Sequence, residues 1–380
     1  MEKWKEYRLG DIAEFRTGKL NSNAAVENGK YPFFTCAPET YLINDYAFDQ
    51  KAILLAGNNA EGNFCIKYYE GKFNAYQRTY VINPTDDNVD IQFLYYALQL
   101  CLQSFKNLSQ GTSTKFLTAK ILNAFNIQVP SLSTQKIISN IIKSLDDKIE
   151  VNRKINENLE QQAQALYKSW FVDFEPFRDQ PFVESELGMI PKGWRVLSFK
   201  DFISPSVEKS PVGLFPEYSV TNNGIIPREA KFNKKLSKEG SKNKILRKDN
   251  LVFGMSREIL NWGIMEDEIG GVSSAYNVYR LDANKIKPIY LRLYMRSKIS
   301  DFNSLIGTAA REGQSLDKGA LMQKKIYIPT MKVYDDFNTI YLSYIKLQKN
   351  VEQESRRLAE LRDALLPKLM SGEIKVEDVT

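Results

Sequence analysis

The sequence predicts an α+β protein in which two related, mixed α/β domains alternate with two long helices. The first observation behind this prediction is an internal repeat. The segment from Trp4 to Ile12 returns as the segment from Trp194 to Phe202, and Ala75-Tyr76 returns as Ala275-Tyr276, at offsets of 190 and 200 residues. A duplication of this length indicates two domains in a pseudo-twofold arrangement and excludes a solenoid of short repeats.

The second observation is a long helical stretch after each globular copy, free of interior glycine and marked by apolar residues at heptad spacing. About 36 residues of each stretch fit this pattern, or about 54 Å of helix at 1.5 Å per residue. Because a whole domain returns between the stretches, we expect them to pack as an antiparallel coiled coil. The apolar positions are Ile138, Ile141, Leu145, Ile155, Leu159 and Leu166, then Phe337, Ile340, Tyr344, Leu347, Val351, Leu358, Leu361 and Leu365. The polar interruptions are Lys148, Asn152, Gln162 and Glu354.

Together the repeat and the helical stretches divide the chain into five segments. A length of 380 residues exceeds a single core and suits two domains of ordinary size. We expect the first domain over residues 1–130 and the first long helix over residues 131–175. A linker over residues 176–190 precedes the second domain, residues 191–329. The second long helix and a C-terminal tail fill residues 330–380.

Several enzyme classes are excluded by what the sequence lacks. It contains no histidine, so the chain cannot supply an imidazole base or a His-ligated metal. No two prolines are adjacent, so the Asn/Asp-Pro-Pro-aromatic motif of amino-methyltransferases is missing. Gly57 to Gly62 has the glycine spacing of a phosphate loop, but Asn63-Phe64 stands where Lys-Ser/Thr is required. These absences favour a binding protein that holds no cofactor or metal of its own.

Composition and cysteine content indicate a soluble, cytoplasmic protein. The chain is 43% hydrophobic and 26% charged, and no apolar run is long enough to span a bilayer. The start Met1-Glu2-Lys3-Trp4 lacks the apolar core of a signal peptide. Cys36, Cys65 and Cys101 lack the spacing of a metal site, so we expect buried free thiols.

Positive charge is concentrated in the second copy. Residues 191–329 hold 24 basic and 14 acidic side chains, whereas residues 1–130 hold 13 of each. Between residues 231 and 248, eight cations accompany one acid, Glu239. This density is typical of contact with phosphates, and a solvated lysine-rich loop is the alternative.

The predicted helix length favours duplex DNA as the partner. A spacer that holds two related domains tens of ångströms apart matches the repeat of duplex DNA, about 34 to 36 Å per turn. Because the two copies have diverged, the two half-sites should differ in sequence. A coiled-coil scaffold that carries two protein-binding domains is the alternative.

Three motifs resemble the specificity subunit of type I restriction-modification enzymes. They are LYKSWFVDFEPF from Leu166 to Phe177, SELGMIPKGW from Ser185 to Trp194, and LRDALLPKLMSGEI from Leu361 to Ile374. The resemblance extends over the whole chain. It implies two target recognition domains separated by two antiparallel helices, and a non-catalytic role in choosing the DNA sequence.

The same resemblance implies a set of partners. These are double-stranded DNA, two methyltransferase subunits that bind S-adenosylmethionine and modify adenine, and restriction/translocase subunits that cut the DNA. Cleavage far from the site is implied for type I systems, and cleavage near the site for some related systems.

Candidate DNA-binding residues rest on side-chain chemistry alone. Arg, Lys, Asn and Gln suit base edges, whereas Lys, Arg, Ser and Thr suit phosphates. In the first domain the candidates are Lys19, Asn58, Asn59, Gln77, Arg78, Thr112, Ser113 and Lys115. In the second they are Asn222, Asn223, Lys234, Lys235, Lys242, Lys244, Ser256, Arg257, Ser274, Arg311 and Gln314. Each side chain could instead cap a helix or complete a turn.

Overall fold

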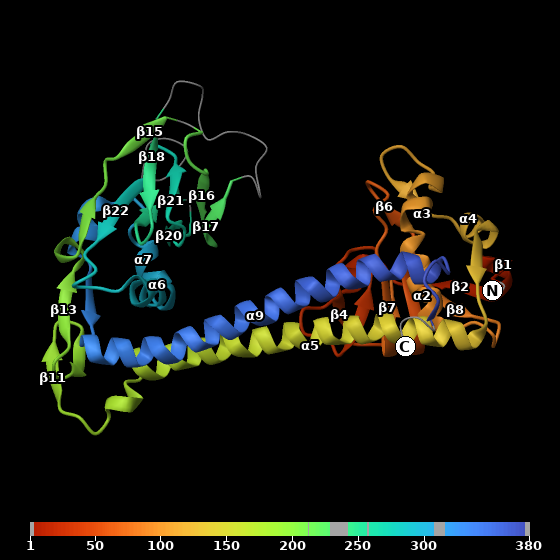
Figure 1. The fold of residues 1–380 in the computed structure, drawn as a ribbon, viewed down its shortest axis with the longest axis horizontal. Coiled ribbons are helices and arrows are strands. Elements are labelled where there is room, and N and C mark those ends of the chain that lie inside the picture. The colour runs from red at the N-terminus through yellow and green to blue at the C-terminus, as the bar shows by residue number, and fades with distance from the viewer. Residues whose placement is uncertain (1–3, 212, 229–241, 257, 308–315, 377–380) are drawn as a thin grey trace. The chain divides into compact units, whose positions relative to one another are not determined.

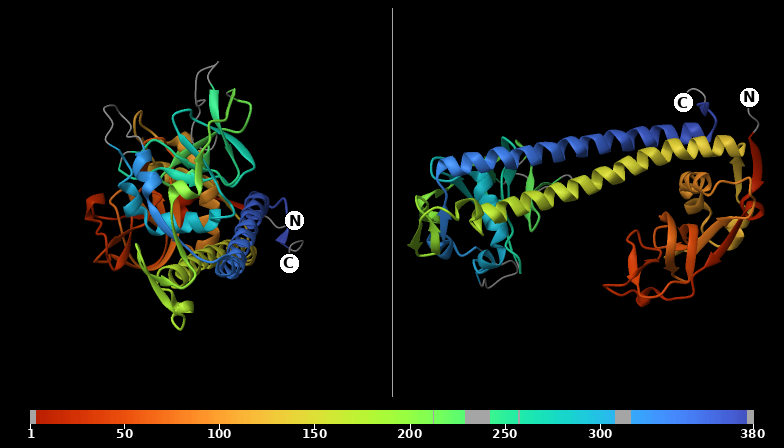
Figure 2. Two further views of the ribbon diagram at one scale, coloured as in Figure 1. Left: turned by 90° about the vertical axis from the view of Figure 1, so that its left-hand side faces the viewer. Right: turned by 90° about the horizontal axis from the view of Figure 1, so that it is seen from below.

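The chain folds into two compact units, as a computed structural model shows for residues 4–211, 213–228, 242–256, 258–307 and 316–376 (Figures 1 and 2). Unit 1 comprises Met1–Glu157 and Gln348–Thr380, and unit 2 comprises Asn158–Leu347. Each long helix contributes residues to both units, so a unit is not one continuous segment of the chain.

A six-stranded sheet forms the centre of unit 1 (Figure 1). The strands of this unit are β1 (Lys5–Arg8), β2 (Ala13–Thr17), β3 (Tyr31–Phe34), β4 (Tyr41–Ile43), β5 (Phe48–Ala56), β6 (Asn58–Asn59), β7 (Ile66–Ala75), β8 (Thr79–Pro84), β9 (Lys115–Phe116) and β10 (Asn126–Val129). Its shorter helices are α1 (Leu9–Ile12), η1 (Ser22–Ala24), α2 (Ile91–Leu100), α3 (Leu102–Leu108) and α4 (Ala119–Ala124). The sheet order is β2-β8-β5-β7-β3-β4, parallel only between β3 and β7, and β1 pairs with β10.

The central strand β5 has a core on each of its faces, because successive side chains of a strand point to opposite sides. Ile53 and Leu55 belong to a cluster that includes Phe93 of α2. Leu54, between them, belongs to a second cluster with Phe34. The apolar run of β5 is therefore buried on both sides, as expected for a central strand.

Unit 2 repeats part of this plan, with a four-stranded sheet that corresponds to four strands of unit 1 and a separate three-stranded sheet. Its strands are β11 (Phe182–Ser185), β12 (Gly188–Pro191), β13 (Arg195–Ser198), β14 (Ile203–Pro205), β15 (Lys209–Pro211), β16 (Tyr218–Thr221), β17 (Gly224–Pro227), β18 (Lys242–Arg247), β19 (Leu251–Phe253), β20 (Trp262–Ile264), β21 (Ile269–Val272), β22 (Asn277–Leu281) and β23 (Lys325–Ile328). Its shorter helices are η2 (Glu175–Phe177), η3 (Phe199–Asp201), α6 (Pro288–Ser297), α7 (Ile299–Asn303) and α8 (Lys318–Gln323). The order β14-β22-β19-β20 corresponds to β2-β8-β5-β7, the three-stranded sheet has the order β15-β18-β21, and β13 pairs with β23 as β1 does with β10. The α+β fold and its internal repeat are confirmed.

Two helices of 40 residues, α5 (Leu132–Phe171) and α9 (Met331–Met370), pack together. In unit 1, Arg362 pairs with Asp146 at 2.9 Å, and Asn152 donates a hydrogen bond to Glu354 at 2.8 Å. Residue numbers rise along one helix as they fall along the other, so the helices are antiparallel, as predicted. Both carry charged residues along their length, and no described helix could cross a lipid bilayer.

The buried stripe of these helices differs in part from the predicted heptads. Ile138 and Leu159 are buried as predicted, as are Phe337 and Val351. Four predicted core positions are wrong, because their side chains are 37% to 47% exposed: Ile155, Ile340, Leu347 and Leu361. An α-helix repeats every 3.6 residues, not 3.5, so a contact stripe drifts away from fixed heptad positions.

The tryptophan at the start of each repeat, Trp4 or Trp194, packs against the segment that directly follows one of the long helices. In unit 1, Gly372 follows α9 with φ +74°, and a Cβ on it would lie 3.0 Å from Nε1 of Trp4. In unit 2, Phe174 and Phe177 follow α5, and their ring centroids lie 5.4 Å from that of Trp194. The internal repeat therefore includes the segments that follow the C-terminal ends of α5 and α9.

Replacing Asp146 with Ala should lower the free energy of unfolding by about 1.5 to 3 kcal/mol, the range for hydrogen bonds to charged groups. The reason is that Asp146 accepts a hydrogen bond from the hydroxyl of buried Tyr96 at 2.8 Å as well as pairing with Arg362. Urea unfolding measures the change. The control is Asp147→Ala, which removes only an exposed pair with Lys143 and should cost less than about 0.5 kcal/mol. If Asp146→Ala and Asp147→Ala lowered the free energy of unfolding equally, the contacts of Asp146 with Tyr96 and Arg362 would contribute no special stability.

Candidate nucleic-acid interface

Three loops of unit 1 meet at one place, although they are far apart in the sequence. Asn58 and Asn59 of β6 pair with Phe116 and Lys115 of β9. The backbone N–H of Gly57 donates to the carbonyl oxygen of Arg78 at 2.8 Å, which attaches the turn between β7 and β8. The structure thus brings together Asn58, Asn59, Gln77, Arg78 and Lys115 from the predicted set.

Two glycines allow the neighbouring loops to approach this cluster. A Cβ on Gly18 would lie 1.7 Å from the carbonyl oxygen of Ala75, so only glycine permits the contact that places exposed Lys19 beside the β7–β8 turn. Gly111 has φ +110°, and a Cβ there would lie 2.0 Å from the carbonyl oxygen of Thr114. The tight loop that results leaves Thr112 and Ser113 exposed.

Some predicted side chains of unit 1 are already engaged within the protein. The Oδ1 of Asn59 accepts from the backbone N–H groups of Glu61 and Asn63, at 2.9 and 3.1 Å. The Nε2 of Gln77 donates to Asn21 at 2.8 Å. Both contacts stabilise loops, so contact of either residue with DNA stays a prediction. Among the described residues, the buried Oδ1 of Asn58 has no hydrogen-bond partner.

Sequence reasoning missed two residues of this cluster. The guanidinium of Arg78 lies over the ring of Phe116, 5.3 Å from its centroid. Lys106 of α3 donates to the Oδ1 of Asn63 at 2.7 Å. The only signal for Phe116 was an apolar side chain beside a polar turn. For Lys106, which lies on a helix, there was no signal.

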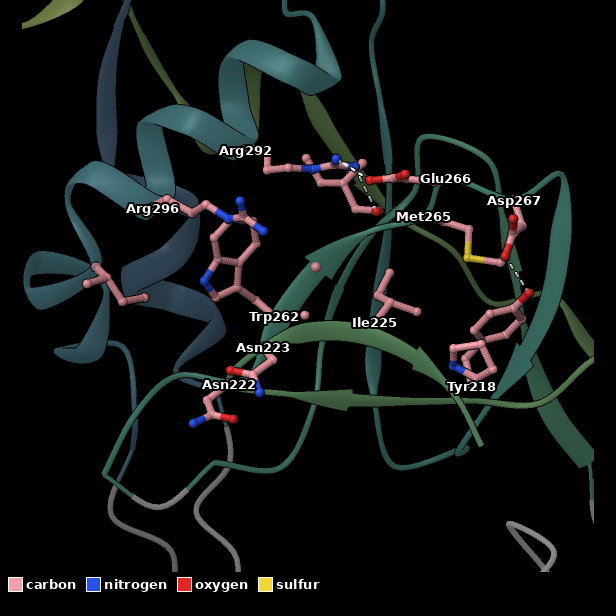
Figure 3. Close-up of a pocket in the computed structure, with 15 residues that line it drawn as sticks. Tyr218, Asn222, Asn223, Ile225, Trp262, Met265, Glu266, Asp267, Arg292 and Arg296 are labelled. Atoms are coloured by element: carbon pink, nitrogen blue, oxygen red, sulfur yellow. Dashed lines mark hydrogen bonds and ion pairs between the residues drawn. The ribbon is translucent and has the colours of Figure 1, made fainter. Parts of the chain in front are cut away.

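In unit 2, Asn222 and Asn223 line a hollow of about 630 Å³ between the β16–β17 hairpin, β20 and α6. Figure 3 shows Arg292 and Arg296 projecting from α6 at the same hollow, with Trp262 of β20. Arg292 pairs with Glu266 and donates to the carbonyl oxygen of Ile264 at 3.1 Å. Its charge is therefore neutralised locally, whereas Arg296 is exposed and forms no ion pair within the described part of the chain.

A second cationic surface of unit 2 lies on β15 and β18; we call Lys209, Lys242 and Lys244 the lysine face. Lys209 is directly opposite Lys244 in the antiparallel pair, and Lys242 is two residues from Lys244, so all three share one side of the strands. None of the three is ion-paired among the described residues. By contrast, the nearby cations Arg247 and Arg280 both bind Glu208.

The lysine face is electrostatically unfavourable without a counterion. Burial lowers the pKa of the Lys244 ammonium, and the positive charges of Lys318 and Lys209 lower it further. The Nζ of Lys244 also donates to the carbonyl oxygen of Tyr276, in the turn that carries exposed Ser274. Like charges placed directly opposite are destabilising, and bound phosphate would relieve that repulsion.

The remaining predicted residues of unit 2 fall into two groups. Ser256 is buried, and its hydroxyl accepts from the backbone N–H of Asn261 at 2.8 Å, so it stabilises a loop and its contact with DNA stays a prediction. Five candidates lie outside the described residues: Lys234, Lys235, Arg257, Arg311 and Gln314. In the described parts of the chain, no group of Cys, Asp and Glu side chains could hold a metal ion.

Units 1 and 2 thus contain related α+β domains, each with basic and amide side chains on its loops, and each long helix contributes residues to both units. A family model described as the type I restriction modification DNA specificity domain matches residues 1–161. Residues 1–161, less than half of the chain, are therefore similar to the DNA specificity domain of type I restriction-modification systems.

The relatives are consistent with this similarity. The chain is 37% identical to the EcoDI specificity subunit of Escherichia coli over 52% of its own length and 48% of that protein. It is 26% identical to the MjaIX specificity subunit of Methanocaldococcus jannaschii over 77% of its own length and 71% of that protein. The match thus spans about half of the first relative. A solved specificity subunit from M. genitalium shares the fold, with a TM-score of 0.60, 16% identity, and 97% and 96% of the two chains covered.

Proposed function

We propose that this chain selects the DNA sequence for a type I restriction-modification complex. Each unit would read one half of an asymmetric, bipartite site in the major groove. The observation that carries the proposal is the repeated domain, because four corresponding strands and the loop after the central strand recur with different residues. In the loop after the central strand, Asn58 and Asn59 of unit 1 are replaced by Met255 and Ser256 in unit 2. Two similar surfaces with different side chains suit two unlike half-sites.

We further propose that α5 and α9 set the gap between the half-sites and dock two methyltransferase subunits. Support for docking comes from large apolar side chains that the helices leave exposed, since exposed apolar surface is typical of protein interfaces. These residues are Val151, Ile155 and Leu361 in unit 1, and Ile340, Leu342 and Leu347 in unit 2. The methyltransferase subunits would bind S-adenosylmethionine and modify adenine, and restriction/translocase subunits would join the full complex.

The purified chain, incubated alone with S-adenosylmethionine and mixed DNA, should transfer no methyl groups. The sequence has no two adjacent prolines and therefore no Asn/Asp-Pro-Pro-aromatic motif, which amino-methyltransferases use at the target base. Adding two equivalents of the partner methyltransferase should produce methylation at defined adenines. Incorporation of labelled methyl groups measures both reactions. Transfer by the chain alone, above the level of a mock purification, would contradict the proposal.

A further inference from the structure

We propose that Arg78 reads a guanine in the half-site recognised by unit 1, and that Phe116 positions it. This inference rests on the proposed function and names one base contact within it. Arg presents two parallel N–H donors that match the O6 and N7 acceptors of guanine in the major groove. Of the predicted candidates in unit 1, Arg78 is the one whose backbone and side chain are both fixed while its charge stays unpaired.

The backbone of Arg78 is fixed from both sides of the turn. Its carbonyl oxygen accepts from the N–H of Gly57 at 2.8 Å and from the thiol of Cys36 at 3.3 Å. The preceding residue, Gln77, donates its backbone N–H to Leu20 at 2.9 Å. The following residue, Thr79, donates to Tyr76 at 2.8 Å, which closes the turn. Four hydrogen bonds therefore fix the point from which the side chain leaves.

The side chain of Arg78 is oriented by Phe116. Its guanidinium carbon lies over the Phe116 ring, 5.3 Å from the centroid, and this cation–π contact restricts the positions that the N–H donors can take. The ring itself is held in place, because Phe116 exchanges two backbone hydrogen bonds with Gln110, at 3.1 and 2.7 Å, and pairs with Asn58. Contacts of this kind preorganise a donor pair for one orientation of a base.

The guanidinium of Arg78 is not paired with a carboxylate among the described residues, so its N–H donors remain available. Arg78 is exposed and takes part in none of the ion pairs found among the described residues, whereas Arg16 and Arg153 both bind glutamate. Lysine could supply a charge for a phosphate as well as arginine can, but it could not supply the fixed two-donor fork. An unpaired guanidinium held over the Phe116 ring, on a turn with a fixed backbone, therefore favours a base edge over the DNA backbone as its partner.

The test uses the complete complex of this chain with its methyltransferase, and maps methylated sites across a genome. One half-site should contain a G·C pair at which Arg78→Lys lowers discrimination against other bases by about tenfold or more, while the other positions and the second half-site stay unchanged. Phe116→Leu should lower discrimination at the same pair, and Phe116→Tyr should preserve it. Arg153→Lys, on α5, is the matched control and should leave the motif unaltered.

Three results would overturn the inference while leaving the proposed function intact. One is a bipartite motif without a G·C pair in either half-site. Another is an Arg78→Lys variant that methylates the wild-type motif with wild-type discrimination. The third is uniform weakening of all sites with the motif unchanged, because that result identifies a phosphate contact. A wild-type complex that methylates no defined sequence would overturn the proposed function as well.

Discussion

Removing one heptad from each long helix should shorten the unread gap of the DNA site by about three base pairs and leave both half-sites unchanged. Seven residues correspond to about 10 Å of helix at 1.5 Å per residue, and base pairs are spaced at about 3.4 Å. The antiparallel pairing identifies the matched heptads, since Asn152 lies opposite Glu354 and Asp146 opposite Arg362. Deleting Lys148–Lys154 together with Glu352–Leu358 removes both partners of the Asn152–Glu354 hydrogen bond, so neither is left without the other. The methylated motif of the mutant complex measures the gap.

A deletion in one helix alone is the control for this experiment. Removing Lys148–Lys154 while α9 is unchanged leaves Glu354 without Asn152 and shifts the packing of the remaining α5 residues against α9. We expect that variant to unfold at lower urea concentration and to lose methylation. The proposal that the helices set the gap fails if the double deletion changes the half-site bases but retains the original gap.

Replacing the lysine face with glutamine should flatten the salt dependence of DNA binding. Each phosphate contact contributes about 0.9 to the slope of log affinity against log salt, so Lys209→Gln, Lys242→Gln and Lys244→Gln together should remove about 2.7. The physical reason is that these three cations have no acid partner among the described residues and can release counterions from DNA. Titrations of the complete complex with its target at several salt concentrations measure the slope.

The matched control also removes three positive charges, but from lysines that are already ion-paired. Lys248 pairs with Glu268, Lys285 with Asp282, and Lys154 with Glu150. Their replacement by glutamine should leave the slope nearly unchanged. If both triple variants lower the slope equally, net charge explains the effect and the lysine face has no special role.

The sequence predicted the parts of the fold that depend on local pattern. The recurrence of Trp4 as Trp194 identified the repeat, because each tryptophan packs at an equivalent place in its unit. The long helices were visible from apolar spacing. Their exposed positions, such as Ile340 and Leu361, were not predictable, because a sequence pattern does not say how far the contact stripe drifts.

The candidate site was less predictable, because tertiary contacts assemble it. Asn58 and Lys115 were each chosen for their residue type, but their neighbouring strands meet only in the folded sheet. Arg292 and Arg296 were not predicted as site residues, because two arginines on an amphipathic helix are typical of a solvent-exposed face. Only the fold shows that they line the same hollow as β20. Likewise, the sequence does not show that Arg247 is neutralised by Glu208 while the lysine face has no acid partner among the described residues, because ion pairs form only in the folded chain.

The most direct test of the central claim is the methylated motif produced in cells that express this chain with its methyltransferase. Adenine methylation should map to two unrelated short sequences separated by a fixed run of unread base pairs, and it should disappear when the chain is omitted. A single continuous motif, or the same motif with and without the chain, would contradict the account.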